Sequence, residues 1–291
     1  MGSTRSQRAL CASHDPLVCV AVDAALAGAG LDVEHAREIP GDALVRTGAI
    51  ALVVVDRAAR LAAGESLGRL RVPVVVVGDD LDDDGLIALM LDGPVSHLVE
   101  DPRDRDLGIT SEKLASGDVF GLEKYVAFGG AVGERVVTSH ASRRDARDEV
   151  CTWAESVGAR RSLVYRLASV VDELLMNALG DTDAGAMLRW AADSRTLAIS
   201  VCDPRGALSQ RDVITHVRRA RDERGRPNPA SEGGAGLGLY LVLANVGSLV
   251  VNLTPGTRTE VVCLFALGRG LRPAVSRVRS LHVFESSLTP A

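Results

Sequence analysis

Short apolar runs alternate with stretches of helical spacing in the first third of the chain. The runs predict strands at residues 18–22, 31–39, 50–55, 72–77 and 97–99, and the spacing between them predicts helices at 24–29 and 86–91. Strands this uniformly apolar are buried on both faces, and strands that alternate with helices form parallel sheets. The pattern therefore predicts an α/β fold with a doubly wound parallel sheet.

The second half of the chain has a different pattern. Helical spacing covers much of residues 134–157 and all of 163–179. Two alternating runs, 187–192 and 196–201, flank a polar turn and predict a hairpin. A basic amphipathic helix is predicted next at 211–225, and strands follow at 249–253, 260–267 and 280–284, the last at a sheet edge. This order predicts a two-layer α/β sandwich, with an antiparallel sheet and helices on one face.

These patterns predict two domains. Residues 1–14 are expected to form a tail, residues 15–102 the first domain and residues 134–291 the second. The intervening stretch, 103–133, is predicted to be a linker because it begins in a charged run. Within it, residues 117–125 hold two of the few aromatic side chains. We expect that segment to pack between the domains, and docking of a partner is the alternative.

Composition narrows the classes of function. The 291 residues carry a net charge of −5 and only 3% aromatic residues, which argues against a surface that stacks nucleic-acid bases. The apolar runs are far too short to cross a bilayer, so no membrane role is expected. Residues 1–7 are polar with no apolar stretch behind them, and the sequence predicts no signal peptide.

The cysteines indicate the cellular compartment. The five of them are scattered and form no C-x-x-C pair, so the sequence indicates neither a metal site nor a disulfide framework. Reduced thiols are typical of the cytoplasm, which is the predicted location.

Three polar signals follow one another in the second half. Glu173 and Asn177 are four residues apart on a predicted helix, so their side chains leave it on one face. Asp203 follows an apolar strand at a turn, and the glycine-rich stretch 233–239 leads into another apolar run. Glycines at a helix start let backbone N–H groups approach phosphate oxygens. For the helix alone, a solvated polar stripe is the alternative interpretation.

In this order, the three signals resemble the nucleotide-binding domain of Hsp90, DNA gyrase, sensor histidine kinases and anti-sigma-factor serine kinases (the Bergerat, or GHKL, fold). The resemblance covers about the last half of the chain. It implies that Asn177 binds Mg²⁺ and that Glu173, the candidate catalytic residue, orients or activates a water or hydroxyl. It further implies that Asp203 contacts adenine. The other cofactor-binding positions that it implies are Gly206, Gly234, Gly236, Gly238 and Thr259.

One motif departs from the family. After the strand the family reads Asp-x-Gly-x-Gly, whereas this chain reads Asp203-Pro204-Arg205-Gly206-Ala207. Arg205 would either crowd the base or add a cation to the pocket. Residues 225–234 are expected to form a lid over the nucleotide.

The first domain resembles a response-regulator receiver over residues 15–102. Asp56 ends the predicted third strand, where a receiver carries its phosphoacceptor. The remaining receiver site is depleted, because Asp23 stands alone after the predicted first strand. Gly78 and Asp79 follow the fourth strand in place of a hydroxyl residue, and Glu100 follows the fifth in place of a Lys. We therefore expect a pseudo-receiver used for docking, with phosphorylation of Asp56 as the weaker alternative.

Together these resemblances imply a bacterial signal-transduction protein that binds ATP and Mg²⁺. His140 lacks the acidic neighbour of a histidine-kinase site, so the phosphoryl acceptor would be a Ser or Thr of a partner protein, as for anti-sigma-factor kinases, or water. The alternative is a non-catalytic signalling adaptor whose nucleotide site is structural or lost. Both resembled families often dimerise, so a homodimer is a further expectation.

Overall fold

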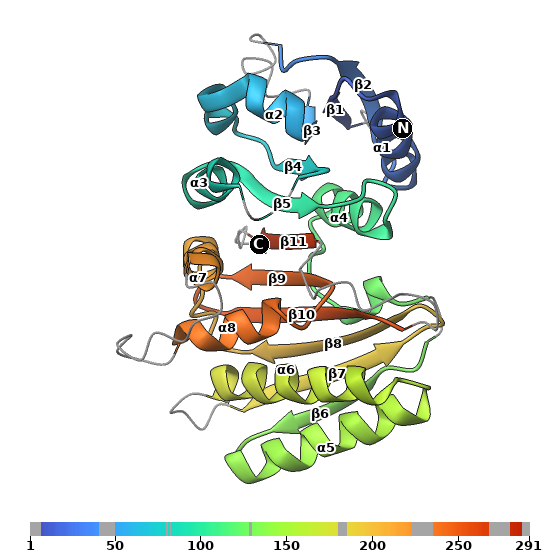
Figure 1. Cartoon of the computed structure of the whole chain (residues 1–291), viewed down its shortest axis with the longest axis vertical. Coiled ribbons are helices and arrows are strands. Elements are labelled where there is room, and N and C mark those ends of the chain that lie inside the picture. The colour runs from blue at the N-terminus through green and yellow to red at the C-terminus, as the bar shows by residue number, and fades with distance from the viewer. Residues whose placement is uncertain are drawn as a thin grey trace, which may run out of the picture. The chain divides into compact units, whose positions relative to one another are not determined.

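The protein is mixed α/β, and its chain divides into two compact units in the computed structural model (Figure 1). The first unit comprises Met1–Val119 with Arg279–His282, and the second comprises Phe120–Val278 with Val283–Ala291. The structure describes residues 7–40, 50–79, 81, 83–127, 130–179, 185–222, 235–267 and 280–286. Over these ranges, every helix is too short or too polar to pass through a bilayer.

The first unit is built on a parallel sheet with the strand order β2-β1-β3-β4-β5. Its elements are β1 (Arg8–Ala12), α1 (Pro16–Gly28), β2 (Asp32–Ala36), β3 (Ile50–Asp56), α2 (Arg57–Ala63), the 3₁₀ helix η2 (Gly64–Arg69), β4 (Val74–Val77), α3 (Asp84–Asp92), β5 (Val95–Val99) and α4 (Arg105–Ser116). The predicted alternation of apolar strands and helices is confirmed from β2 onward.

The core of the first unit lies on both faces of this sheet. All four residues of β4 are fully buried, as expected for a strand covered on both sides. On one face, Cys11 and Val54 pack with Val22 of α1 and Leu107 of α4 in a single apolar cluster.

The beginning of the chain differs from the prediction. The expected tail, 1–14, contains β1, and the strand predicted at 18–22 lies inside α1. Asp15 caps this helix by accepting a hydrogen bond from the Leu17 N–H at 2.8 Å, and Pro16 follows at a position where its missing N–H costs nothing. Because α1 is apolar on most sides, periodicity alone did not separate it from a buried strand.

The far end of the chain also departs from the predicted boundaries. Strand β11 (Ser280–Glu285) was expected at an edge of the second domain, but its first three residues pair antiparallel with β5 in the first unit. The predicted linker, 103–133, contains α4, whose Leu107 is fully buried in the first unit. The first unit is therefore assembled from both ends of the sequence.

The second unit has an antiparallel sheet with the strand order β9-β10-β8-β7-β6. Its elements are the 3₁₀ helix η3 (Leu122–Tyr125), β6 (Gly133–Val137), α5 (His140–Ser156), α6 (Arg161–Leu179), β7 (Ala186–Ala192), β8 (Thr196–Asp203), α7 (Gln210–Asp222), α8 (Ala235–Leu243), β9 (Ser248–Thr254) and β10 (Arg258–Ala266). The predicted β7–β8 hairpin is confirmed. Helices α5 and α6 lie across one face of the sheet (Figure 1).

Residues 120–125 of the aromatic segment lie against the opposite face of this sheet. The Gly121 N–H donates to the buried Glu260 carboxylate of β10 at 2.9 Å, and Asn252 of β9 donates to the same oxygen at 2.9 Å. The guanidinium of Arg258 lies 4.2 Å from the ring centroid of Phe120. The boundary between the two units falls within this segment, since residues 117–119 belong to the first unit and residues 120–125 to the second.

Gly206 joins the end of β8 to the β9–β10 turn. Its φ is +59°, and its carbonyl accepts a hydrogen bond from the Gly256 N–H at 2.9 Å. A Cβ at position 206 would overlap the backbone of Thr254, Thr257 and Arg258. This position therefore requires glycine both for its backbone conformation and for the close approach of the turn.

Gly256 provides a matched control, because its φ is +70° but a Cβ there would meet nothing within 4 Å. We expect Gly256→Ala to destabilise the second unit by about 1 kcal/mol through backbone strain alone. Gly206→Ala should cost about 1–3 kcal/mol more, since it also adds the overlap. Both tryptophans, Trp153 and Trp190, lie in the second unit, so urea unfolding followed by tryptophan fluorescence measures the difference. Equal losses for the two variants would contradict the packing argument.

Candidate functional site

Helix α6 carries the first two predicted site residues on adjacent turns. Its apolar side packs on the sheet through buried Leu167, Val171 and Leu175, which fixes the direction of the remaining side chains. The Asn177 side-chain amide donates to Oε1 of Glu173 at 3.0 Å. That bond uses the amide nitrogen, so Oδ1 of Asn177 is directed elsewhere and is a suitable oxygen ligand for Mg²⁺.

Glu173 is a buried carboxylate held against the start of α8. The residue is 8% exposed, and a Cβ at position 238 would overlap its carboxylate, so any side chain there would displace the carboxylate from this position. Burial raises the pKa of Glu173 above its ordinary value of 4.5, and the hydrogen bond from Asn177 offsets part of that rise. The structure thus brings Glu173, Asn177 and Gly238 together, as the sequence predicted.

Asp203 ends β8 on the face of the sheet that α6 covers. Both of its oxygens are engaged by Arg205, with the Arg205 Nε at 2.9 Å from Oδ1 and the Nη2 at 2.9 Å from Oδ2. The same Nη2 donates to the Ala178 carbonyl at 2.6 Å, near the end of α6. Hydrogen bonding to Asp203 raises the pKa of Arg205, so the guanidinium stays charged. We call this arrangement the Asp203–Arg205 clamp.

The clamp was not predictable in detail from the sequence. The departure of Arg205 from the glycine pattern was visible, but its reach to the end of α6 depends on the tertiary fold. A cation at the C-terminal end of a helix stabilises the last carbonyl groups, which explains why an arginine is accommodated there.

Thr259 lies directly beside Asp203 in the sheet. The two residues are register partners between β10 and β8, so their side chains leave the sheet on the same face. The Thr259 hydroxyl is buried and has no hydrogen-bond partner among the described residues. Buried hydroxyl groups are normally hydrogen-bonded, so this one is a candidate partner for a water or a ligand atom.

Several predicted positions are only partly described. Gly236 lies in the first turn of α8, whereas Gly234 and the predicted lid, 225–234, fall outside the described residues. Gly206 is described, and its role in the structure is the turn contact given above. His140 is the first residue of α5 and is exposed.

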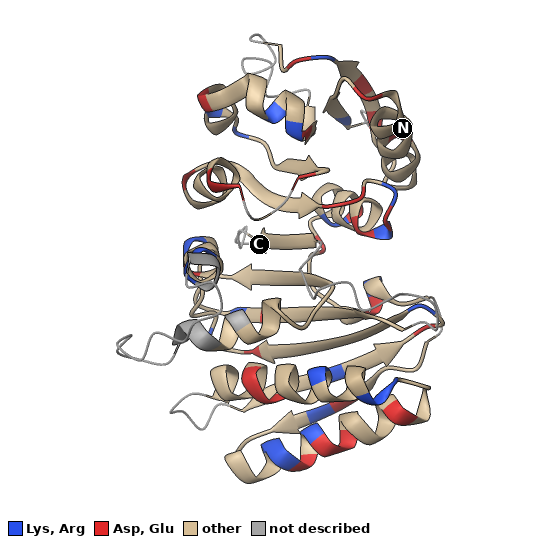
Figure 2. Cartoon of the chain, viewed as in Figure 1, with Lys and Arg blue, Asp and Glu red and all other residues tan. Residues whose placement is uncertain are grey.

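Charges on α5 are interleaved rather than gathered in one patch, as Figure 2 shows. Arg143 and Arg147 both pair with Asp172 of α6, and Arg135 of β6 pairs with Glu149. These arginines are neutralised by neighbouring acids and therefore form no basic patch for phosphate groups on this helix.

Asp56, the predicted phosphoacceptor, lies at the end of β3 in the first unit. Its Oδ1 accepts the Ala59 N–H at 2.7 Å and caps α2, and its Oδ2 accepts the Ser13 hydroxyl at 2.5 Å. The first strand is β1, so the residues after it are Ser13, His14 and Asp15, and not Asp23 as the predicted strand boundaries implied. Each carboxylate oxygen of Asp56 thus already has a structural partner.

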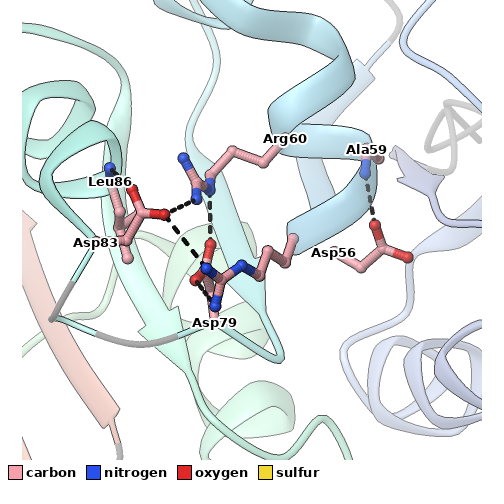
Figure 3. Close-up of polar contacts among 7 residues, drawn as sticks. Asp56, Ala59, Arg60, Asp79, Asp83 and Leu86 are labelled. Carbon is pink, nitrogen blue, oxygen red and sulfur yellow. Dashed lines mark hydrogen bonds and ion pairs between the residues drawn. The ribbon is translucent and has the colours of Figure 1, made fainter.

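A buried ion-pair cluster lies at the ends of β3 and β4 (Figure 3). The Arg60 Nε lies 2.6 Å from Asp79, and its Nη2 lies 2.9 Å from Asp83. Arg57 reaches the same two acids at 3.6 Å. Figure 3 shows the Asp56 side chain directed away from this cluster, toward Ala59. The charge of Asp79 is therefore neutralised by Arg57 and Arg60, to which the sequence analysis gave no role.

Comparison with known proteins adds little to this geometry. Neither the protein-family models nor the curated proteins contain a match to the chain. A similar solved structure is described as the SiaB–SiaC complex from Pseudomonas aeruginosa. The aligned chain is 14% identical, the alignment covers 46% of this chain and 88% of that one, and the TM-score is 0.34. A TM-score this low supports no conclusion about fold or function.

The buried ion pair leads to a prediction about stability. Side-chain exposure is 3% for Arg60 and 0% for Asp79, so Arg60→Ala leaves a buried carboxylate without its closest cation. We expect a loss of about 3–5 kcal/mol. Arg57→Ala is the matched control, because Arg57 is half exposed and should cost less than about 1 kcal/mol. Urea unfolding followed by circular dichroism tests this, and similar losses for both variants would contradict it.

The raised pKa of Glu173 predicts a pH-dependent stability. Between the ordinary and the raised pKa, the folded chain binds a proton that the unfolded chain has released, so stability falls as the pH rises through this range. A glutamine side chain does not titrate in this range, so the Glu173→Gln variant lacks this pH dependence. Its unfolding free energy relative to wild type should therefore increase as the pH rises above 4.5, as measured by urea unfolding. Glu155→Gln, at an exposed position of α5, is the matched control variant. A difference between Glu173→Gln and wild type that is constant with pH would refute the assignment.

Proposed function

We propose that the protein is a cytoplasmic signalling protein whose second unit binds ATP and Mg²⁺ in a GHKL-type site. Transfer of the γ-phosphoryl group to a Ser or Thr of a partner protein is the proposed activity. The observation that carries this proposal is the convergence of Glu173, Asn177 and Gly238, which come from two segments about sixty residues apart. Bound ATP would supply the phosphoryl group, and bound Mg²⁺ would offset its negative charge.

The roles of the residues follow from their surroundings. Oδ1 of Asn177 would hold the metal ion, because the amide nitrogen is already bonded to Glu173. Glu173 would orient the attacking hydroxyl or accept its proton. Burial raises the pKa of Glu173 above its ordinary value, which makes it a better proton acceptor. The Thr259 hydroxyl, which has no hydrogen-bond partner among the described residues, and the Asp203 carboxylate lie on one face of the sheet. Both would contact the adenine base of ATP.

The Asp203–Arg205 clamp determines how readily such a site would accept adenine. Both oxygens of the carboxylate that would accept the adenine amino group already accept hydrogen bonds from the guanidinium of Arg205. Adenine would therefore have to displace charged hydrogen bonds, which weakens its binding. On this proposal, the protein in which the Asp203–Arg205 clamp is formed is in a resting state with low affinity for nucleotide.

The clamp also favours a second candidate function, a non-catalytic adaptor. In that case the Asp203–Arg205 pair is permanent, and the site is a structural remnant. The first unit fits either function as a docking module of the pseudo-receiver type. Glu100 follows β5 where a receiver carries its Lys, and both oxygens of Asp56 already have partners.

Calorimetric titration of the full chain with ATP in the presence of Mg²⁺ distinguishes the two functions. If the site binds nucleotide, Arg205→Ala should tighten ATP binding about tenfold, because it frees a carboxylate from a charged hydrogen bond. Asp203→Asn should weaken binding, and Asn177→Ala should abolish its dependence on Mg²⁺. Arg195→Ala, at an exposed position of the β7–β8 turn, is the matched control and should change nothing.

Turnover completes this test. Glu173→Gln should abolish phosphate release or transfer while leaving ATP affinity within a few-fold of wild type. If neither wild type nor Arg205→Ala binds ATP, the nucleotide proposal fails and the adaptor function remains.

A further inference from the structure

Three potential metal ligands meet in the first unit, away from the site described above. They are the thiols of Cys11 and Cys19 and the imidazole of His35, and their ligand atoms all lie within 4.8 Å of one another. The sequence analysis predicted no metal site, because the cysteines form no C-x-x-C pair, and the three residues are eight and sixteen positions apart along the chain. The fold alone brings them together.

The strand register explains two of the three positions. Strands β1 and β2 are parallel neighbours, and Cys11 is the direct partner of His35. Adjacent strands are about 4.8 Å apart, and directly paired residues project from the same face of the sheet. Cys11 and His35 are therefore held side by side by backbone hydrogen bonds and not by flexible loops.

Helix α1 supplies the third ligand and a supporting carboxylate. It packs on this face of the sheet, with Cys19 against the cluster that contains Cys11. Asp23 is one turn further along the same side of the helix, and its Oδ1 lies 2.8 Å from Nε2 of His35. Metal-binding histidines are commonly oriented by a carboxylate in this way, which leaves the other ring nitrogen for the metal.

We propose that Cys11, Cys19 and His35 bind a zinc ion, with Asp23 positioning the imidazole. Two thiolates and an imidazole form a ligand set that suits Zn²⁺, and a fourth position can be filled by water. Cys11 is fully buried, whereas the His35 and Asp23 side chains are 40% and 50% exposed, so the ion can enter from solvent.

The alternative interpretation is that Cys11 and Cys19 are packing residues or a disulfide pair. Packing accounts for Cys11 but not for the Asp23–His35 contact at the edge of the same cluster. A disulfide would remove both thiolates, so it excludes the metal site and can be tested separately.

Zinc content of the full chain, purified under reducing conditions without chelator, gives the first measurement. Elemental mass spectrometry should find one equivalent of zinc per wild-type chain. The Cys19→Ser and His35→Ala variants should contain none. Neither of these residues is fully buried, so both variants should fold, as circular dichroism can verify. Cys151→Ser, at a half-buried helix cysteine outside the cluster, is the matched control and should retain the metal.

Titration with Co²⁺ identifies the ligands. Wild type should develop sulfur-to-cobalt charge-transfer absorption and the visible bands of a tetrahedral ion, and Asp23→Asn should bind about 10–100-fold more weakly. Three results would overturn the proposal. They are zinc retained in Cys19→Ser and His35→Ala, a cobalt spectrum without the sulfur band, or wild-type Cys11 and Cys19 recovered as a disulfide under the same conditions.

Discussion

The absence of a side chain at position 238 is the constraint on which the candidate site depends. A single methyl group there would occupy the space of the Glu173 carboxylate. Because the position is glycine, α8 can approach α6 closely enough to bury that carboxylate, and burial then sets its proton affinity. The packing of α8 against α6 thus determines the acid–base character of the Glu173 side chain.

Both units place acids at the ends of strands and then neutralise them with arginines from nearby segments. Arg205 reaches Asp203 at the end of β8, and Arg60 reaches Asp79 just after β4. The two pairs differ in exposure, since Arg60 is almost fully buried whereas Arg205 is partly accessible. A buried pair is costly to break and suits a permanent structural role, while an accessible one can exchange its partner for a ligand. This contrast is why we assign a functional role to Arg205 and a structural one to Arg60.

The parts of the fold that were predictable are those in which local pattern and tertiary environment agree. The β7–β8 hairpin has clean alternation around a polar turn, and the Glu173–Asn177 spacing on a helix fixes their contact by geometry alone. The first half of helix α1 was mistaken for a strand, whereas its second half was predicted as helix, because its residues are apolar on most sides and only the Asp15–Pro16 start signal reveals where it begins. The clamp and the Cys11–His35 pairing depend on register and on packing between distant segments, which no local pattern records.

Strand β11 has a consequence for the order in which the protein is made. Residues 280–282 complete the sheet of the first unit beside β5, yet nearly two hundred positions of chain separate them from that strand. A ribosome therefore makes residues 120–278 of the second unit before the last strand of the first one emerges. Until then the nascent chain carries β5 with one row of backbone amide and carbonyl groups unpaired, next to a strongly apolar surface. The growing polypeptide thus passes through a period in which intermolecular strand addition competes with its own completion.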